Sequence, residues 1–142
     1  MKRLLFVVIV LASWSSALSC SCGSRSLEQQ FDKAAIVFRA WLVSTGRPDS
    51  NRTRKQPDAE DFLVGRFEII EVFKGDPASI EFVYSRDNGG ACGVPLEKGA
   101  EYVFFAAEDG YVALCDGSFR HSQIAMSEPR FRKLVEKVRA LD

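Results

Sequence analysis

The alternation of hydrophobic and polar positions along the chain predicts five β-strands. Two long apolar runs, at 34–45 and 62–73, are rich in the β-branched and aromatic residues that strands favour. A shorter segment at 80–85 has the period of two that is typical of a strand, and 101–107 and 111–115 complete the set. Because the first run has little polar alternation, we expect it to be a curved strand of a barrel.

Turn and loop signals separate these strands. Asp109 and Gly110 predict a two-residue hairpin turn between the last two strands. The segment 46–61 is polar and rich in turn residues, which indicates a loop. It contains a glycosylation sequon at Asn51, which is either an occupied site in a eukaryotic host or a chance match.

Two helices are predicted outside the strands. Ser26 and Gln29 have the spacing of a capping box at the start of the first. Ser127 and Pro129 are typical of the start of the second. The second helix places apolar residues at helical spacing, namely Phe131, Leu134, Val135 and Val138. We expect a solvated outer face, rather than a docking face for an anion, from Arg130, Arg132, Lys133, Lys137 and Arg139.

These elements predict an all-β fold with flanking helices, a five-stranded antiparallel barrel of the OB type. Such barrels often bind single-stranded nucleic acids on aromatic side chains. The aromatic residues here have the spacing of a barrel core instead: Phe67, Phe73, Phe82, Tyr84, Tyr102, Phe104 and Phe105. We therefore expect no nucleic-acid partner.

The first residues have the features of a secretory signal peptide. Lys2 and Arg3 are a positive start, and an unbroken apolar run follows at 4–12. Ala17 and Ser19 stand at the two small-residue positions of a cleavage site. The apolar run is shorter than the roughly 20 residues that a membrane-spanning helix needs.

The predicted organisation is a signal peptide at 1–19 followed by a single domain at 20–142. The chain has 19 Lys and Arg and 19 Asp and Glu residues, so removal of Lys2 and Arg3 leaves a net charge of −2 (17 minus 19). A nearly neutral chain is not typical of a polyanion binder. We expect a secreted monomer with no membrane partner, or a periplasmic or cell-surface protein if the host is bacterial.

Four cysteines remain in the predicted mature chain: Cys20, Cys22, Cys92 and Cys115. An even number in a small secreted protein indicates two disulfides, with three possible connectivities. A direct bridge between Cys20 and Cys22 would close a very small, strained ring. The alternative is a zinc site, which the lack of paired C-x-x-C spacing disfavours.

The mature chain would begin with Cys20-Ser21-Cys22, and in this it resembles the tissue inhibitors of metalloproteinases. Further segments resemble that family in order and at similar spacing: Ile36-Val37-Phe38-Arg39-Ala40, Val72-Phe73-Lys74-Gly75, Phe82-Val83-Tyr84, Ala91-Cys92-Gly93 and Leu114-Cys115. The resemblance implies the netrin-like form of the OB fold. It also implies one connectivity, Cys20–Cys92 with Cys22–Cys115.

The chain departs from the family pattern in three places. A third disulfide, whose first cysteine would align near Asp32, is missing, and so is the family's C-terminal subdomain. Residues 23–25 (Gly-Ser-Arg) replace a stretch that commonly contains proline. These differences bear on which protease the chain would fit.

The resemblance implies an inhibitor of zinc metalloendopeptidases with no cofactor of its own. The α-amine and carbonyl of Cys20 would chelate the catalytic zinc of the protease, and Ser21 would enter the specificity pocket. The implied contact residues are Cys20, Ser21, Cys22, Asn88, Gly89, Gly90, Ala91, Cys92, Gly93 and Val94. For the loop at 88–94, a disulfide-anchored turn without protease contact is the alternative.

Other functions have less support in the sequence. A thiol pair of Cys92 and His121 conflicts with the even cysteine count, and no Ser-His-Asp or phosphate-loop pattern is present. We therefore expect no enzymatic activity. The main alternative is a secreted netrin-like binding module that does not inhibit proteases. Acylation of Cys20 would block chelation, although the preceding residues 17–19 match a lipoprotein signal poorly.

Overall fold

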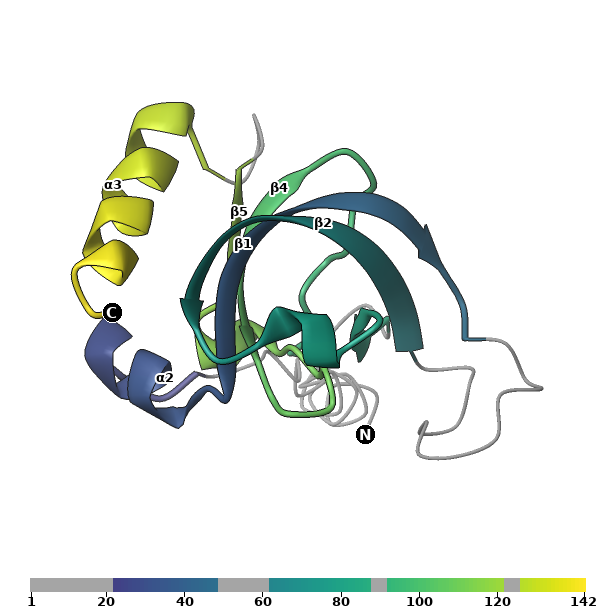
Figure 1. Ribbon diagram of the computed structural model, residues 1–142, viewed down its shortest axis with the longest axis horizontal. Helices are drawn as coiled ribbons and strands as arrows, with labels where there is room; N and C mark the ends of the chain where they lie inside the picture. The colour runs from purple at the N-terminus through teal and green to yellow at the C-terminus, as the bar shows by residue number, and fades with distance from the viewer. Residues whose placement is uncertain (1–21, 49–61, 88–91, 122–125) are drawn as a thin grey trace, which may run out of the picture.

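The computed structural model describes residues 22–48, 62–87, 92–121 and 126–142. Within these ranges the chain forms one five-stranded antiparallel sheet in the order β3-β2-β1-β4-β5 (Figure 1). The strands are β1 (Ile36–Gly46), β2 (Phe62–Lys74), β3 (Val83–Arg86), β4 (Glu101–Ala106) and β5 (Phe119–His121). The helices are α2 (Leu27–Lys33) and α3 (Glu128–Arg139), and two 3-10 turns are η2 (Pro77–Ser79) and η3 (Leu114–Asp116). The predicted fold class is confirmed.

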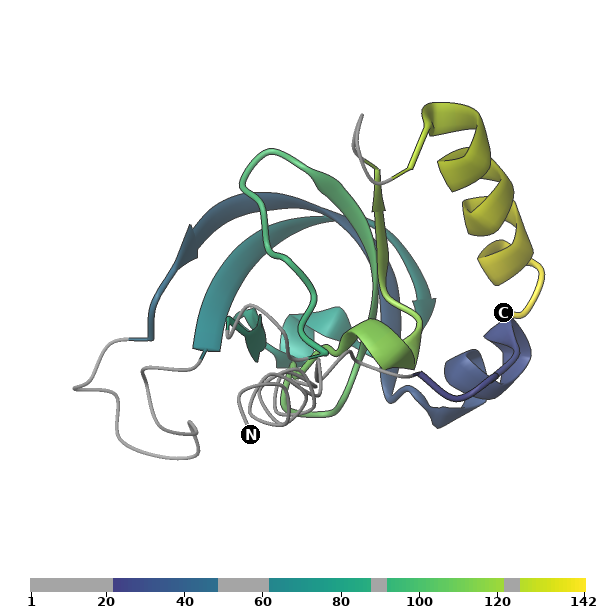
Figure 2. The same cartoon turned by 180° about the vertical axis from the view of Figure 1, so that it is seen from behind.

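The sheet curls into a half-barrel, as the two opposite views show (Figures 1 and 2). A parallel bridge between Tyr84 and Tyr111 links β3, at one edge, to the segment that follows β4. Tyr84 N donates to Gly110 O at 3.0 Å, and Val112 N donates to Tyr84 O at 2.9 Å. At this side the curled sheet is therefore joined by two backbone hydrogen bonds rather than by a full ladder.

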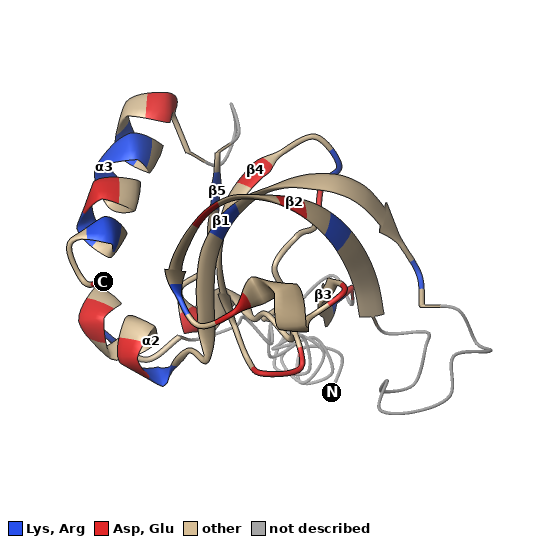
Figure 3. Cartoon of the chain, viewed as in Figure 1, with Lys and Arg blue, Asp and Glu red and all other residues tan. Residues whose placement is uncertain are grey.

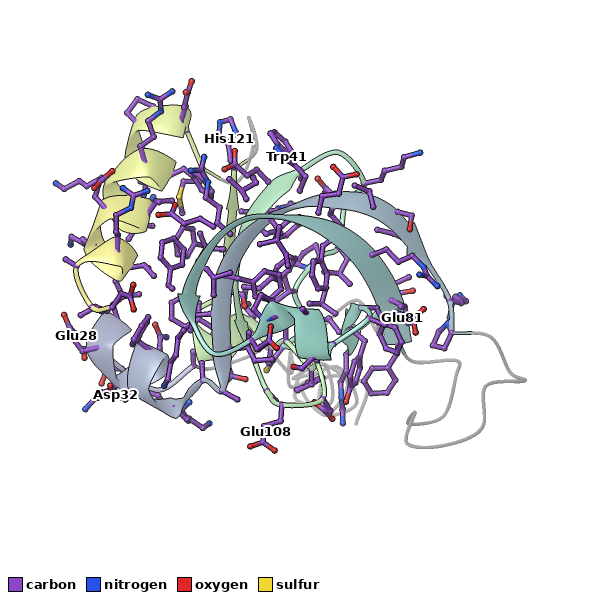
Figure 4. The ribbon with its side chains drawn as sticks, in the orientation of Figure 1. Glu28, Asp32, Trp41, Glu81, Glu108 and His121 are labelled. Atoms are coloured by element: carbon purple, nitrogen blue, oxygen red, sulfur yellow. A yellow bond between two sulfur atoms is a disulfide. The ribbon has the colours of Figure 1, made fainter. Side chains whose placement is uncertain are left out.

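Strand β4 and the first half of β1, residues 36–40, are covered on both faces, which explains their largely apolar sequences. Ile36, Phe38 and Ala40 pack inside the curl with alternate residues of β4. On the opposite face Val37 packs with Val103 beneath the two helices. The side chains filling the curl are visible in Figure 4. The start of β1 thus lacks alternation because each of its faces meets a separate hydrophobic core, whereas Trp41 and Val43 further along are exposed.

Helix α2 begins with the capping box that the sequence predicts. Gln29 N donates to Ser26 Oγ at 3.3 Å, and Ser26 N donates to Gln29 Oε1 at 3.0 Å. Helix α3 begins after Ser127, as predicted, but the Ser127 side chain makes no capping hydrogen bond. Both helices bury apolar residues against the outer face of the sheet: Phe31, Phe131, Val135 and Val138.

Ion pairs also fasten α3 to the sheet, although a fully solvated charged face is the sequence expectation. Arg139 Nε and Nη2 donate to the two carboxylate oxygens of Glu71 at 2.7 and 2.8 Å. The hydrogen bond from Arg139 lowers the pKa of Glu71. On the sheet itself Arg39 pairs with Glu71 at 3.9 Å and makes a short bond to Glu101. Figure 3 shows acidic and basic residues interspersed along these elements.

The predicted fifth strand is wrong. Residues 111–115 form only isolated bridges and then turn η3, and β5 lies later, at Phe119–His121, where it pairs with β4. Gly117, with a φ of +105°, adopts the left-handed conformation that ends η3 and lets the chain return along β4. The hairpin predicted at Asp109 and Gly110 therefore leads into a connection and not into a strand.

Several predicted core aromatics lie outside the barrel interior. Phe73 and Phe105 pack under the helices, while Tyr102 and Phe104 lie inside as expected. Phe82 is only partly buried. Tyr84 is buried as expected, and its neighbours Val83 and Ser85 are fully buried as well, so β3 is covered on both faces.

The loop predicted at 46–61 lies between β1, which ends at Gly46, and β2, which begins at Phe62. Asn51 in this loop lies outside the described residues. No helix in the described part of the chain is long and apolar enough to cross a membrane.

Candidate functional site

The predicted contact residues fall partly within the described chain. Cys22 is exposed, Cys92 and Gly93 are partly buried, and the side chain of Val94 is only 4% exposed and packs in the barrel core. The others lie outside the described residues: Cys20, Ser21, Asn88, Gly89, Gly90 and Ala91.

A disulfide joins Cys22 to Cys115, which are 93 positions apart in the sequence and have their Cα atoms 5.1 Å apart. This is one of the two bridges that the family resemblance implies. It also excludes these two thiols as zinc ligands. Cys92 is disulfide-bonded as well, so it is not a thiol nucleophile for His121. Its pairing with Cys20, which lies outside the described residues, stays a prediction.

The two segments that carry Cys92 and Cys115 lie side by side. Leu114 N donates to Cys92 O at 2.8 Å, and Gly93 forms an antiparallel bridge with Ala113. Cys22 is therefore tethered next to Cys92, although they are 70 positions apart in the chain. The fold thus brings together one residue of the predicted C-x-C and the end of the predicted contact loop.

The Cys92 segment packs against strand β3 at very close range. A Cβ atom built on Gly93 would lie 2.0 Å from the backbone oxygen of Arg86. Only a glycine permits this approach. The Cys92 segment therefore packs directly on the backbone of β3.

The chain beyond Val94 is held by Tyr102. Its hydroxyl donates to Pro95 O at 2.7 Å and accepts from Glu97 N at 2.8 Å. The Tyr102 side chain is fully buried, and burial raises the pKa of its hydroxyl. The two bonds hold Pro95 and Glu97, the two ends of a three-residue segment. No local sequence pattern indicates this role of Tyr102.

The chain that follows Cys22 is also tied to turn η3. Arg25 and Lys33 each place a charged nitrogen 3.6 Å from Asp116 Oδ1. Leu114, in the same turn, is 48% exposed and lies beside Cys92. Sequence reasoning missed Leu114 as a surface residue because it lies in the segment that was predicted to be a strand.

His121 belongs to a different part of the molecule. It ends β5, pairs with Glu101 across the sheet, and its ring centroid lies 5.6 Å from that of Phe131 in α3 (Figure 4). Across the described ranges, no group of three or more His, Cys, Asp or Glu side chains is placed to hold a metal ion.

The chain is similar to known proteins over these same segments. The family model for tissue inhibitor of metalloproteinase matches residues 18–135. Among curated relatives, metalloproteinase inhibitor 2 of Homo sapiens is 32% identical over 129 residues, covering 80% of this chain and 54% of the relative. The corresponding inhibitor of Gallus gallus is 31% identical over 119 residues, covering 77% of this chain and 52% of the relative.

The chain thus spans about half the length of the curated relatives it matches. The family match extends over most of the described sheet, both segments of the site and most of α3. This agrees with the resemblance drawn from the C-x-C and the spacing of the later segments. The chain therefore belongs to the tissue inhibitor of metalloproteinase family.

Proposed function

We propose that the chain inhibits zinc metalloendopeptidases through the main chain of Cys20, exposed when residues 1–19 are removed. The observation that carries this proposal is the Cys22–Cys115 disulfide. It ties the third residue of the proposed mature chain to the barrel beside Cys92. A rigidly held N-terminus at this position is what a chelating inhibitor requires.

The chemistry follows from the first residue. An α-amine has an ordinary pKa of about 7.7–8.0, so a substantial neutral fraction exists at physiological pH. The neutral amine and the carbonyl oxygen of Cys20 form a five-membered chelate ring with a metal. In a catalytic zinc site three protein ligands leave one position for water. Displacing that water removes the nucleophile of the protease. The zinc belongs to the protease and not to this chain.

The neighbouring residues complete the proposed contact surface. Ser21 enters the specificity pocket beside the zinc, and its small side chain makes a modest contribution. The loop at 88–94 lies against the substrate cleft, with Val94 contributing through its backbone because its side chain is buried. The exposed Leu114 adds an apolar contact next to Cys92.

The disulfide framework supports the affinity of this surface. A flexible N-terminus would lose conformational entropy on binding, and that loss weakens the complex. Cys92 is disulfide-bonded, and Cys20 is the only other cysteine in the sequence that the Cys22–Cys115 bridge does not use. We infer that the Cys20–Cys92 bridge holds the chelating residue itself.

The proposal includes the setting in which the chain acts. We infer that it is secreted, since chelation needs the free amine that signal cleavage creates, and that it acts as a monomer. Its partner is a zinc metalloendopeptidase, and neither nucleic acid nor membrane takes part.

An N-terminal extension tests the mechanism. The chain starting at Cys20 is titrated against a panel of zinc metalloendopeptidases, beside a variant with one additional alanine before Cys20. The extension blocks the amine, so inhibition is lost while the disulfides and the unfolding midpoint stay unchanged. A matched control carries the additional alanine after Asp142 and inhibits like the native chain.

Two outcomes would count against the proposal. Equal inhibition by the extended variant would refute chelation by Cys20. Absence of inhibition by the native chain, with an intact N-terminus and both disulfides, would favour the netrin-like binding module.

A further inference from the structure

Ser85 is a fully buried polar residue in the middle of β3. Its hydroxyl accepts a hydrogen bond from Val94 N at 2.7 Å and donates one to Val112 O at 2.9 Å. A serine hydroxyl has one donor and can accept as well, so this arrangement uses it in both roles. The residue therefore joins two backbone segments that are 18 positions apart in the chain.

These two segments are the ones that carry the disulfide anchors of the proposed inhibitory site. Val94 follows Cys92 by two residues, and Val112 precedes Cys115 by three. The bonds at Ser85 add to the direct contact between the segments, where Leu114 N donates to Cys92 O. Ser85 thus bonds, from the barrel interior, to a residue close in sequence to each of the two anchors.

The spacing of the anchors matters because of the chain that they hold. Cys20 and Cys22 are only two residues apart, so their partners can bind both without distortion only if Cys92 and Cys115 keep a fixed separation. The Leu114–Cys92 bond and the Gly93–Ala113 bridge pair the two segments directly with each other. The two bonds at Ser85 tie both segments to β3 as well, and this fixes how the pair is placed on the sheet.

We propose that Ser85 is a positioning residue for protease inhibition, acting through Val94 and Val112 on the segments that hold the mature N-terminus. This inference rests on the proposed inhibitory function and deepens it. Its energetic basis is pre-organisation: a binding segment that is already ordered loses less entropy in the complex. Ser85 itself is buried and makes no contact with the protease.

The test compares Ser85→Ala with Ser118→Ala in the mature chain with both disulfides formed. Ser118 is a matched control, since it is also buried and its Oγ accepts one backbone hydrogen bond, from Phe105 N of β4 at 2.9 Å. Removing the Ser85 hydroxyl leaves Val94 N without its buried acceptor. We expect the inhibition constant to rise about tenfold, the loss typical of one buried hydrogen bond. Ser118→Ala lowers stability and leaves the inhibition constant unchanged.

Amide exchange gives a readout that general destabilisation would not reproduce. The Val94 amide should exchange faster in Ser85→Ala at a pH and temperature where both variants remain folded, with Ser118→Ala as the reference. If Ser85→Ala does not fold, Ser85→Thr and Ser85→Val replace it. These two side chains have nearly the same shape and differ in the hydroxyl, so Ser85→Thr should inhibit about tenfold more strongly than Ser85→Val.

The outcomes separate this inference from the proposed function. If the wild type inhibits and Ser85→Ala has the same inhibition constant, the role of Ser85 is overturned while the proposed function stands. The same holds if Ser85→Ala and Ser118→Ala raise the inhibition constant equally. A wild-type chain that inhibits no zinc metalloendopeptidase would overturn the proposed function and this inference with it.

Discussion

Replacing Gly93 by alanine should disrupt the site by a purely steric route. The new Cβ would lie 2.0 Å from the backbone oxygen of Arg86, whereas real Cβ atoms almost never approach closer than 3.0 Å. The position of the new Cβ is fixed by the backbone of residue 93, and the atom it meets is the backbone oxygen of Arg86, so no side chain can rotate to relieve the contact. The Cys92 segment and β3 must therefore separate by about 1 Å, the difference between these two distances.

The consequences of that separation can be estimated from the neighbouring bonds. The hydrogen bond from Val94 N to Ser85 Oγ is 2.7 Å long, and a separation of about 1 Å would take it beyond hydrogen-bonding distance. Overpacking in a well-packed region costs about 1–3 kcal/mol. A lost buried hydrogen bond adds about 1 kcal/mol. We therefore expect Gly93→Ala to lower the free energy of unfolding by about 2–4 kcal/mol.

Urea denaturation with both disulfides intact measures this loss. Gly46→Ala is the control, because a Cβ on Gly46 meets no atom within 4 Å. It should leave the free energy of unfolding within about 0.5 kcal/mol of wild type. If Gly93→Ala is as stable as Gly46→Ala, the close packing of the Cys92 segment on β3 is not present in solution, and the reasoning fails. A stable Gly93→Ala variant that still inhibits would also remove the structural basis for the role of Ser85.

Three further predictions concern the rest of the fold. The double variant Cys22→Ser/Cys115→Ser opens a bridge between residues 93 apart and should lose about 3–5 kcal/mol by urea denaturation; a loss below about 1 kcal/mol would contradict it. Because the bond from Arg139 lowers the pKa of Glu71 from its ordinary 4.5, the wild type should be more stable than Glu71→Gln above that pH. The difference should disappear as the pH falls through the lowered pKa, and a pH-independent difference would exclude the ion pair as its source. Phe131→Ala should cost about 3 kcal/mol because that ring is 2% exposed beneath α3, whereas an unchanged unfolding midpoint would show that α3 does not dock there.

Local signals were sufficient where the physics is local. The capping box of Ser26 and Gln29 involves residues three apart, and the apolar spacing of α3 is set by the helical repeat. The long runs that became β1 and β2 are apolar enough to need burial in any fold. The C-x-C and the even cysteine count indicated a disulfide framework, and the Cys22–Cys115 bridge agrees with it.

The final strand shows where such signals fail. The apolar residues at 111–115 have strand-like composition, but the segment crosses to β3 at Tyr84 and then turns through η3. The short strand that pairs with β4 is Phe119–His121, whose sequence contains two basic or titratable residues and no alternation long enough to detect. Which segment joins the ladder depends on the path that the curled sheet leaves open, and that path involves residues far apart in the chain.

By itself, the sequence determined the capping box of α2, the two longest strands, the presence of disulfides and the family resemblance, because periodicity, capping and cysteine count are properties of the chain. Tertiary structure alone decided that both faces of β1 are buried over residues 36–40, that Arg139 binds Glu71, and that Ser85 and Gly93 contact the backbone of neighbouring segments. A serine in an alternating segment has no feature that distinguishes a solvated hydroxyl from a buried one. The difference arises only when the sheet curls and brings the backbone of residues 94 and 112 within hydrogen-bonding distance of the same oxygen.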